Sequence, residues 1–438
     1  MAGSAPLSPL TAKDARHASE RRSPVARRLW HWVFGGLSLI AALCWVRGFV
    51  ASERVSAQRL PELTRAQLGF LANGLERRAD DMQRLFPEGR VFTLALYGGA
   101  WVNEGRHAEA PIRERALGEC RRTLSLLESA RSRAPFGPVA GLPHGMFYEA
   151  WTNWLRGGCL SLEATPGAAA SASHAFTAAC ARLENAITLH GPFVESYPGA
   201  AWPADSVVGV ASLAACAQWL GERPQRAVQK WLDAVRRELD PTTLLVPHSA
   251  HAPGARGSSS ALICAFLPSI DRAFAEQQYA RFRQHFATRR LGGLLAFREY
   301  PNGQDGPSDV DSGPLLLGVS GPATIVGMAA AHENGDAATW LELRRASEAV
   351  GLPLEWSGRR TYGFGRLAVG EAFLAWASRA ESWTSAAKED ASLDAEAGGR
   401  AALRLLFVAG LVVIVGLGAL AWRSPTGVGP ARGRRTVR

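Results

Sequence analysis

Residues 405–422 read LLFVAGLVVIVGLGALAW, and this uncharged stretch decides how the chain is organised. A second apolar stretch, LWHWVFGGLSLIAALCWV at 29–46, lies near the other end, and its apolar character continues to residue 51. An α-helix rises about 1.5 Å per residue, so about 20 apolar residues cross the hydrocarbon core of a bilayer. The sequence therefore predicts two transmembrane helices, over 29–51 and 401–422.

Charged residues beside these stretches predict their orientation. The formal net charge is +10, and most of the excess lies in the two tails. Residues 1–28 contain six Lys or Arg against two acidic residues, and residues 423–438 contain five Arg and no acidic residue. Basic flanks stay in the cytoplasm, so both tails are predicted to be cytoplasmic and residues 52–400 to be exported. A signal peptide cleaved near Val55–Ala57 is the alternative for the first stretch, and a buried soluble helix for the second.

This topology predicts a multi-pass protein of the cytoplasmic membrane, with its main domain on the periplasmic or extracellular side and the lipid bilayer as a partner. A surface that binds nucleic acid would carry its positive charge on the folded body, where Lys and Arg can contact phosphates. Here the excess lies in the tails instead. The sequence therefore predicts no nucleic-acid partner.

Helical periodicity dominates between the two apolar stretches, and alternating β-branched runs are scarce. The sequence predicts an all-α body over 52–380, followed by a polar tether at 381–400. About twelve helices joined by short Gly and Pro breaks predict a closed (α/α)6 toroid, or six-hairpin barrel; an open solenoid is the alternative, but no repeat of fixed length is present. The predicted helices cover 64–85, 89–104, 110–131, 144–161, 170–190, 205–220, 224–238, 258–267, 271–288, 312–332, 336–350 and 366–380.

The chain has six cysteines, and Cys44 lies in the first apolar stretch. The others are widely and irregularly spaced, without a CxxC motif or a Cys/His cluster, so no zinc site is predicted. Each lies among Ala, Leu and Val, which favours a role as a small buried hydrophobe, with one disulfide as the alternative in an oxidising compartment. These five body cysteines are Cys120, Cys159, Cys180, Cys216 and Cys264.

Three long loops at 190–203, 240–257 and 292–312 are the candidate site, because loops at one end of a helical toroid line a common pocket. Carboxylates in and beside these loops suit general acid/base chemistry, in which burial keeps one acid protonated beside an ionised partner. Asp205 also stands where a helix N-cap is expected, and a purely structural capping role is the alternative. The predicted catalytic residues are Asp205, Glu299 and Asp311.

Side chains around these acids predict a surface for a small molecule or a glycan. Tyr197 and Trp202 supply flat apolar faces, and Arg256 can hold an anionic group or pair with a loop carboxylate. His144 is expected at the mouth of an aromatic helix. The predicted binding residues are His144, Tyr197, Trp202, Arg256, Tyr300 and Asp309.

Two groups of residues resemble metal ligands. Asp305, Asp309 and Asp311 are hard oxygen ligands of the kind that calcium prefers, but the EF-hand spacing is absent. The DVDSG stretch that contains two of them also looks like a helix start. His248 and His251 lie three residues apart in a loop, without an accompanying carboxylate. The sequence therefore predicts neither a metal nor a cofactor.

Three motifs resemble proteins that carry a linalool dehydratase/isomerase-like domain. They are LPHGMFYEAWTNWL at 142–155, ESYPGAAWPADSVVGVASLA at 195–214 and FREYPNGQDGPSDVDSGPLLLGVSGPAT at 297–324. The resemblance covers roughly residues 130–380 and implies an (α/α)6 toroid with a central pocket. In the enzyme that names the family, acid/base catalysis on a small terpene alcohol uses cysteine, histidine and acidic residues. No cysteine lies between residues 191 and 206 here, so no catalytic cysteine is carried over.

Three functional hypotheses remain open. The first is an acid/base enzyme outside the cytoplasmic membrane, a lyase, isomerase or glycan-active enzyme, acting on a sugar-containing substrate. The second, implied by the resemblance, is the same kind of chemistry on a lipid or terpenoid. The third is a non-catalytic module that binds a ligand or assembles a membrane complex. Fold alone does not separate them, because one superfold hosts many functions.

Overall fold

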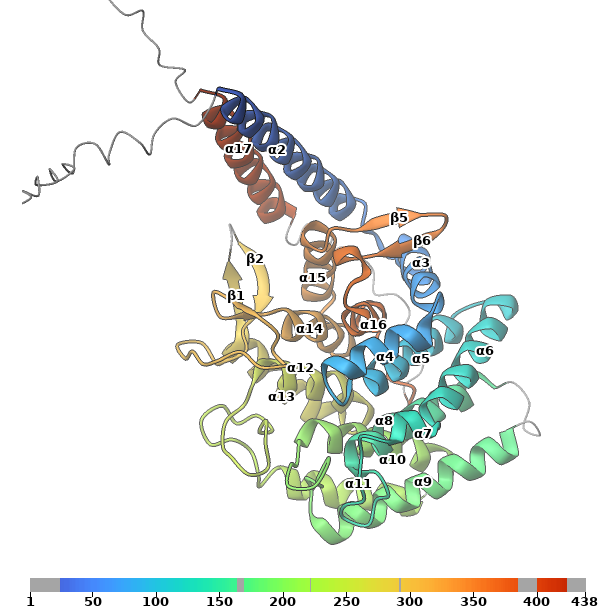
Figure 1. The fold of residues 1–438 in the computed structure, drawn as a ribbon. Helices are drawn as coiled ribbons and strands as arrows, with labels where there is room; N and C mark the ends of the chain where they lie inside the picture. Colours follow the sequence, from blue (N-terminus) through green and yellow to red (C-terminus); the bar gives the residue numbers. More distant parts are fainter. Residues whose placement is uncertain (1–23, 164–168, 221, 291–292, 385–399, 424–438) are drawn as a thin grey trace, which may run out of the picture. The chain divides into compact units, whose positions relative to one another are not determined.

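A computed structural model describes residues 24–163, 169–220, 222–290, 293–384 and 400–423 of the chain. This part of the protein is mostly helical, which confirms the all-α class (Figure 1). The chain divides into two units. One contains residues 1–47 and 407–438, and the other, called the body below, contains residues 48–406.

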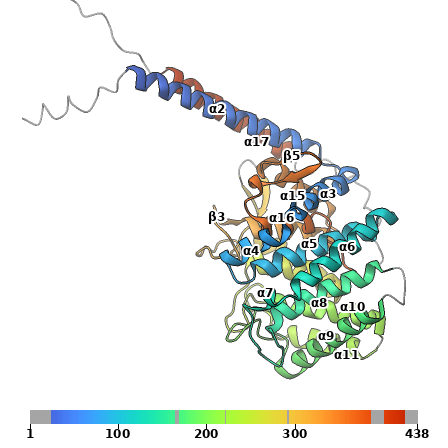
Figure 2. The same ribbon diagram turned by 45° about the vertical axis from the view of Figure 1, so that its right-hand side comes forward.

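Two helices are long and apolar enough to cross a membrane, as predicted. They are α2 (Pro24–Glu53) and α17 (Arg400–Arg423). Only 6% of the residues in the apolar stretch of each helix are buried, so most of their side chains face outward. The two helices run beside each other, and the Trp45 indole donates a hydrogen bond to the Phe407 carbonyl at 2.9 Å (Figure 2). Gly410 allows this approach, because a Cβ there would lie 2.5 Å from the Trp45 ring.

The body contains most of the helices, and their order along the chain follows the predicted pattern closely. They are α3 (Leu60–Ala72), α4 (Leu75–Leu85), α5 (Gly89–Arg106), α6 (Ala110–Leu127), α7 (Ala130–Arg133), α8 (Gly145–Leu162), α9 (Ala169–His190), α10 (Pro203–Leu220), α11 (Glu222–Val235), α12 (Gly257–Phe266), α13 (Arg272–Phe286), α14 (Gly321–Glu333), α15 (Ala337–Val350) and α16 (Ala368–Ala377). Short 3-10 helices lie at Ala57–Arg59, Leu267–Ser269 and Gly363–Gly365.

Six of these helices pack in a continuous sequence. Helix α5 packs on α8, α8 on α10, α10 on α12, α12 on α14, α14 on α16, and α16 packs back on α5. Residues on every side of α5, α12 and α14 are buried, as expected for helices covered all round. The others cover them from outside, and α4 and α11 accordingly place apolar residues on one face and charged residues on the other.

Two predicted helices are each interrupted. The helix predicted over 64–85 is two helices, α3 and α4, separated at Gly74, whose φ of 80° lies in the left-handed region that ends a helix. The one predicted over 110–131 ends as α6 at Leu127, and Ser129 then caps the short α7 by accepting a hydrogen bond from the Ser132 amide. Periodicity continues across both breaks, so it does not reveal them.

The prediction of a helix from residue 312 is wrong for its first part. Residues 315–320 form a β-hairpin of β3 (Leu315–Leu316) and β4 (Val319–Ser320), and α14 begins only at Gly321. The N-cap is Ser320, whose side chain accepts a hydrogen bond from the Ala323 amide at 3.1 Å. Gly318, with φ of 78°, supplies the turn. Two other antiparallel pairs are β1 (Ala287–Arg290) with β2 (Leu294–Phe297) and β5 (Leu354–Trp356) with β6 (Arg359–Thr361).

One pair of body cysteines forms a disulfide. Cys120 of α6 and Cys159 of α8 are bonded, with their Cα atoms 5.9 Å apart. Cys180, Cys216 and Cys264 are free and buried, as expected for small hydrophobes. The structure therefore contains the single disulfide that was the alternative prediction.

The residues after α16 fold back into the body. Trp383 stacks on Trp154 with ring centroids 4.3 Å apart, and its indole donates to the Asn103 side chain at 3.0 Å. Gly158 leaves room for this ring, because a Cβ there would lie 2.5 Å from it. Residues 381–384, which we expected to begin a polar tether, are thus packed in the body. The rest of that predicted tether, up to residue 399, lies outside the described residues.

Candidate functional site

The candidate site is built from the loops that precede α5, α8, α10 and α12, together with the loop between β2 and β3. These loops are tied to one another through their backbones. The Ala250 amide donates to the Ala201 carbonyl at 3.0 Å, and the Gly257 amide donates to the Glu299 carbonyl at 2.8 Å. The three long loops identified in the sequence therefore meet and form one surface, which we call the loop face.

A glycine at the first position of α12 makes this meeting sterically feasible. A Cβ on Gly257 would lie 1.9 Å from the Arg298 carbonyl oxygen, which is far inside van der Waals contact. Gly145, the first residue of α8, is under the same constraint, because its Cβ would lie 2.1 Å from the Ser196 carbonyl oxygen. Both glycines lie where a distant loop crosses a helix start.

Asp205 is the third residue of α10 and lies buried beneath the loop face, 5% exposed. Its carboxylate accepts hydrogen bonds from the Ser196 hydroxyl at 2.6 Å and from the Trp151 indole at 3.4 Å. Burial raises the pKa of Asp205 to about 7, and the charges of Glu88 and Asp311 contribute in the same direction, while the two donors oppose it. Asp205 is therefore a carboxyl group that titrates near neutral pH.

Asp311 is the accessible acid whose charge contributes to the raised pKa of Asp205. It lies in the loop before β3 and is exposed. Partial enclosure by protein atoms raises its pKa to about 6, and the nearby charges of Asp309 and Glu88 add to the shift, while Arg256 opposes it. The two carboxyl groups thus combine one buried and one accessible acid, each with a pKa near neutrality.

A row of aromatic and polar groups continues from Glu88, at the start of α5. The Tyr197 hydroxyl donates to the Glu88 carboxylate at 2.7 Å and accepts from the Trp202 indole at 2.9 Å. Trp202 in turn packs against the His248 ring, with centroids 4.9 Å apart, and His248 Nδ1 lies 2.6 Å from Ser259 Oγ. Burial and the charge of Arg256 lower the pKa of His248 to about 4, so its imidazole is neutral at neutral pH.

Arg256 forms an ion-pair cluster on the same face. Its guanidinium lies 2.8 Å from a Glu299 oxygen and also pairs with Asp309. Glu299 is fully buried and accepts hydrogen bonds from the Ser258 hydroxyl and amide at 2.8 and 3.2 Å. Burial raises the pKa of Glu299, against the effect of Arg256. Burial alone would raise the pKa of Asp309, but its hydrogen bonds with Arg256 and Ser312 prevail and lower it to about 2.

Two further predicted binding residues, Tyr300 and His144, lie in different parts of the structure. Tyr300 joins the cluster, because the Arg256 guanidinium lies 5.3 Å from its ring centroid and its hydroxyl donates to the Pro307 carbonyl at 2.8 Å. His144 caps α8 without a side-chain cap bond, and its Nδ1 lies 3.2 Å from the Phe136 carbonyl. The contacts of His144 therefore support the turn before α8, apart from the carboxyl groups.

Two of the three aspartates that could be calcium ligands have arginine partners. Asp305 pairs with Arg298 at 2.6 Å, and Asp309 pairs with Arg256. A carboxylate that already neutralises a guanidinium is a poor ligand for a second cation. Among the described residues, no group of three or more His, Cys, Asp or Glu side chains has the arrangement of a metal site.

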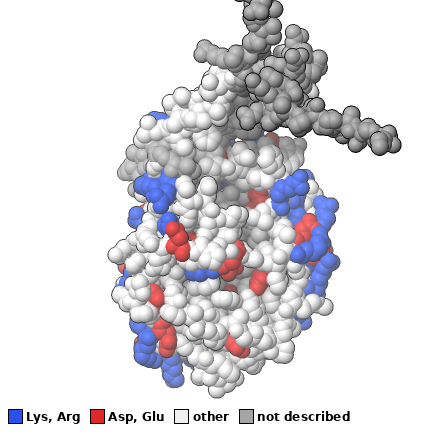
Figure 3. All heavy atoms as spheres, turned by 60° about the vertical axis from the view of Figure 1, so that its left-hand side comes forward, with Lys and Arg blue, Asp and Glu red and all other residues white. Residues whose placement is uncertain are grey.

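Two members of the site were missed by sequence reasoning. Glu88 lies far from the three loops in sequence and reaches Tyr197 only through the packing of α5, and no local pattern marks it. His248 was considered only as a metal ligand, although its neighbour Ser259, two residues inside a helix, is the kind of hydroxyl that fixes an imidazole tautomer. A charge pattern does not reveal either residue: acidic and basic side chains are interspersed on the face shown in Figure 3.

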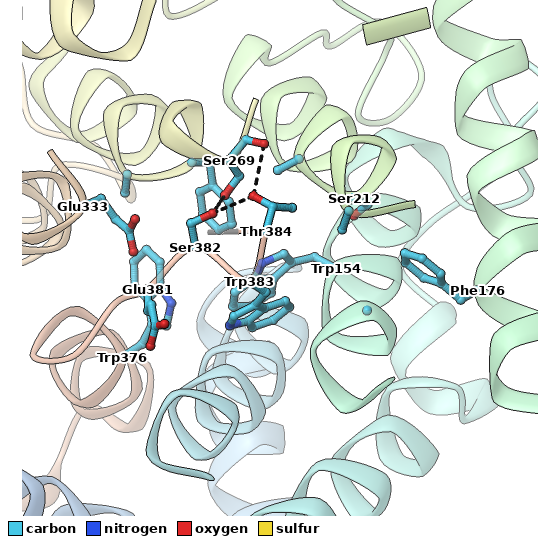
Figure 4. A pocket seen from close by; sticks show the side chains of 15 residues that line it. Trp154, Phe176, Ser212, Ser269, Glu333, Trp376, Glu381, Ser382, Trp383 and Thr384 are labelled. Atoms are coloured by element: carbon cyan, nitrogen blue, oxygen red, sulfur yellow. Dashed lines mark hydrogen bonds between the residues drawn. The ribbon is translucent and has the colours of Figure 1, made fainter. Parts of the chain in front are cut away.

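A cavity inside the body is too small to be a ligand pocket. It has a volume of about 20 Å³, room for about one water molecule. The aromatic rings of Trp154, Trp376 and Trp383 line it, together with the hydroxyls of Ser269 and Ser382, which are hydrogen-bonded at 2.7 Å (Figure 4). The chain's own Trp383 fills this space, so the loop face is the better candidate.

No protein-family model matches the chain, and no curated protein is similar to it.

Proposed function

We propose that the chain is a membrane-anchored acid/base enzyme whose body lies outside the cytoplasm. Helices α2 and α17 would both span the cytoplasmic membrane, with the two basic tails inside. The disulfide between Cys120 and Cys159 supports export, because structural disulfides persist in oxidising compartments.

The body would be a closed (α/α)6 toroid. The support is the cyclic packing of α5, α8, α10, α12, α14 and α16, in which the last helix returns to the first. A second layer of helices packs outside this cycle, as the architecture requires: α6 against α5, α9 against α8, α11 against α10, α13 against α12 and α15 against α14. An open solenoid would leave its first and last helices without such a contact.

The enzymatic proposal rests on two acids of the loop face, Asp205 and Asp311, whose pKa values are both raised toward neutrality. General acid/base catalysis is most efficient when the pKa of the group lies near the working pH. Burial raises the pKa of Asp205 to about 7 and that of Asp311 to about 6, so one can hold a proton while the other is ionised. The accessible Asp311 would exchange protons with the substrate. Asp205 would act through Ser196, whose hydroxyl can both accept and donate.

A neutral, hydroxyl-bearing substrate such as a sugar-containing molecule fits the loop face best. Arg256 is already neutralised by Glu299 and Asp309, so this cation leaves little attraction for an anion. The surrounding carboxylates disfavour negative charge, whereas Trp202 and Tyr300 present rings of the kind that pack against sugar faces. The likeness of three motifs to the linalool dehydratase/isomerase-like family supports a lipid or terpenoid alcohol as the second substrate class.

The test is chemical modification with a water-soluble carbodiimide, which reacts with protonated carboxyl groups. In the full-length protein, modification of Asp311 should be half-maximal near pH 6. Asp309 is a matched internal control, because it is also exposed but its pKa is lowered to about 2. Equal labelling of the two residues across pH 4 to 8 would remove the basis of the acid/base proposal.

A non-catalytic binding module is the second candidate, favoured by one observation. Both carboxylate oxygens of Asp205 already have donors, Ser196 and Trp151, which is also how a purely structural buried acid is satisfied. Ligand screening separates the candidates. Neutral oligosaccharides and terpenols that raise the Tm identify the substrate class, and a bound ligand that remains chemically unchanged favours the binding module.

A further inference from the structure

Two adjoining cavities, both open to solvent, lie where α3, α5, α6 and the β5–β6 hairpin meet. Their volumes are about 450 and 420 Å³, within the range of small-molecule sites. Both are lined by Arg65, Arg115 and Gly358, so they share a boundary. None of their lining residues belongs to the loop face described above.

The smaller cavity is lined by cations and neutral polar groups. Arg65, Arg115 and Arg359 project from three different elements, α3, α6 and β6, and Asn73 and Ser357 complete the polar lining. No carboxylate is among its described lining residues. Only Arg65 of the three has a carboxylate partner among the described residues, so their positive charge is not fully neutralised and favours a bound anion.

Two of these three arginines have no carboxylate partner among the described residues. Arg65 has one carboxylate partner, Glu104, at 3.2 Å. Arg115 instead lies over the Trp101 ring, 4.9 Å from its centroid. Within the described ranges, neither Arg115 nor Arg359 has a carboxylate within ion-pairing distance, whereas buried arginines such as Arg344 are paired. Planar guanidinium groups with free donors bind phosphate oxygens in pairs.

The larger cavity adds an apolar compartment. Its lining includes Leu63, Ala66, Trp101, Pro111 and Ile112. Of the two acidic residues that it also contains, Glu355 is already paired with Arg360 at 2.9 Å. A ligand that filled both cavities would therefore have an anionic end and an apolar end.

We propose that the paired cavities bind a lipid whose headgroup is a terminal phosphate, with the phosphate among Arg65, Arg115 and Arg359 and the first carbons of the chain against Ala66 and Ile112. The chain order supports a lipid as the source of the phosphate, because α3, which carries Arg65, begins only a few residues after the apolar helix α2. The site is independent of the acid/base chemistry proposed for the loop face.

Three soluble probes test this proposal on the full-length protein in an uncharged detergent: dihexanoyl phosphatidic acid, dihexanoyl phosphatidylcholine and inorganic phosphate. We expect saturable binding of phosphatidic acid, measured by calorimetry and by a rise in Tm, and binding of the other two at least about tenfold weaker. Inorganic phosphate that binds as tightly as phosphatidic acid would show a free-anion site and overturn the lipid assignment. Equal binding of phosphatidylcholine would overturn the anion site itself.

Variants connect the binding to the cavities. Replacing both Arg115 and Arg359 by Gln should weaken binding of phosphatidic acid by about tenfold or more, because each charged hydrogen bond contributes strongly. The matched control replaces the exposed Arg113 and Arg237, which line neither cavity, and should bind as the wild type does. Unchanged binding in the first double variant would refute the site.

A third variant tests the apolar part of the same site. Ile112→Ser should weaken the binding of phosphatidic acid and leave the weak binding of inorganic phosphate unchanged. If the double arginine variant unfolds, Arg359→Gln alone provides the comparison, because Arg359 makes no described ion pair. An Ile112→Ser protein that binds phosphatidic acid like the wild type would contradict a lipid chain in the larger cavity.

Discussion

Two roles fit Asp205, a structural role at a helix start and a chemical role in proton transfer. The sequence places it at a helix start, where a capping role is common. In the structure its carboxylate is directed at Ser196 and Trp151, side chains of another loop and another helix. Its hydrogen bonds therefore join three separate segments, which a cap within one helix would not do.

Asp205→Asn should separate these roles. Asn keeps the size of the side chain and one carbonyl oxygen, so the free energy of unfolding should fall by only about 1–2 kcal/mol. It cannot exchange a proton, so an acid/base enzyme should lose activity by about 100-fold or more on whichever ligand the Tm screen identifies.

Asp271→Asn is the matched control for this substitution. Asp271 is a true N-cap, since its side chain accepts from the Phe274 amide at 2.7 Å, and Asn caps a helix about as well as Asp. It should retain both stability and activity. If the two variants behave alike, Asp205 has no proton-transfer role.

The pH dependence of stability gives an independent measurement on Asp205. Its pKa is raised from 3.8 to about 7 in the folded protein, so between these values the folded state keeps a proton that the unfolded state has released. Stability due to this group must therefore fall as pH rises through that interval and level off above it. The Tm of the wild type minus that of Asp205→Asn should decrease from pH 4 to pH 7. A flat or rising difference would mean that the carboxyl group is ionised in the folded state.

At the scale of elements, Trp383 links the segment after α16 to the centre of the body. It stacks on Trp154 and donates to Asn103, and Gly158 is the residue that makes room for it. Because it is 8% exposed, truncation would leave a large cavity.

Trp383→Ala should lower the free energy of unfolding by about 3–5 kcal/mol, through lost burial and the cavity left behind. Trp356→Ala is the control, because Trp356 lies on the β5–β6 hairpin and is 44% exposed. Its replacement should cost about 1 kcal/mol or less. Thermal unfolding of both variants makes the comparison, and equal losses would argue against a central packing role for Trp383.

At the scale of the whole molecule, the disulfide reports the compartment in which the body folds. Four of the six cysteines are free. Protein isolated from membranes, denatured and treated with a thiol-alkylating reagent should therefore show four modified cysteines before reduction and six after it. Six modified cysteines without reduction would contradict the Cys120–Cys159 bond and the proposed export.

Topology can be measured separately with reporter fusions. A reporter placed after residue 60 should be active outside the cytoplasm, and a reporter at the C-terminus should be active inside, because basic flanks stay in the cytoplasm. The same pair of fusions in a chain without residues 21–28 serves as a comparison, since it lacks Arg21, Arg22, Arg27 and Arg28. A cytoplasmic signal from the first fusion in the intact chain would reverse the proposed orientation.

Features that depend on neighbouring residues could be predicted from the sequence. The lengths of the two apolar helices follow from uninterrupted runs of apolar residues, and most body helices follow from periodicity over one or two turns. The same reasoning found the three loops and most of the side chains on the loop face, because Gly, Pro and clustered ionisable residues mark such loops locally. The prediction is wrong at residues 315–320, because this segment has a helical sequence pattern but forms a hairpin.

Features that depend on distant contacts were decided only by the tertiary structure. Glu88 reaches Tyr197 across 109 residues of sequence, and Arg256 meets Glu299 and Asp309 from a different loop. The raised pKa of Asp205 has the same origin, because burial and the charges of other segments set it. The sequence specifies which side chains can act as acids; packing fixes which of them keep their protons, because desolvation and Coulomb interactions depend on distance in space and not along the chain.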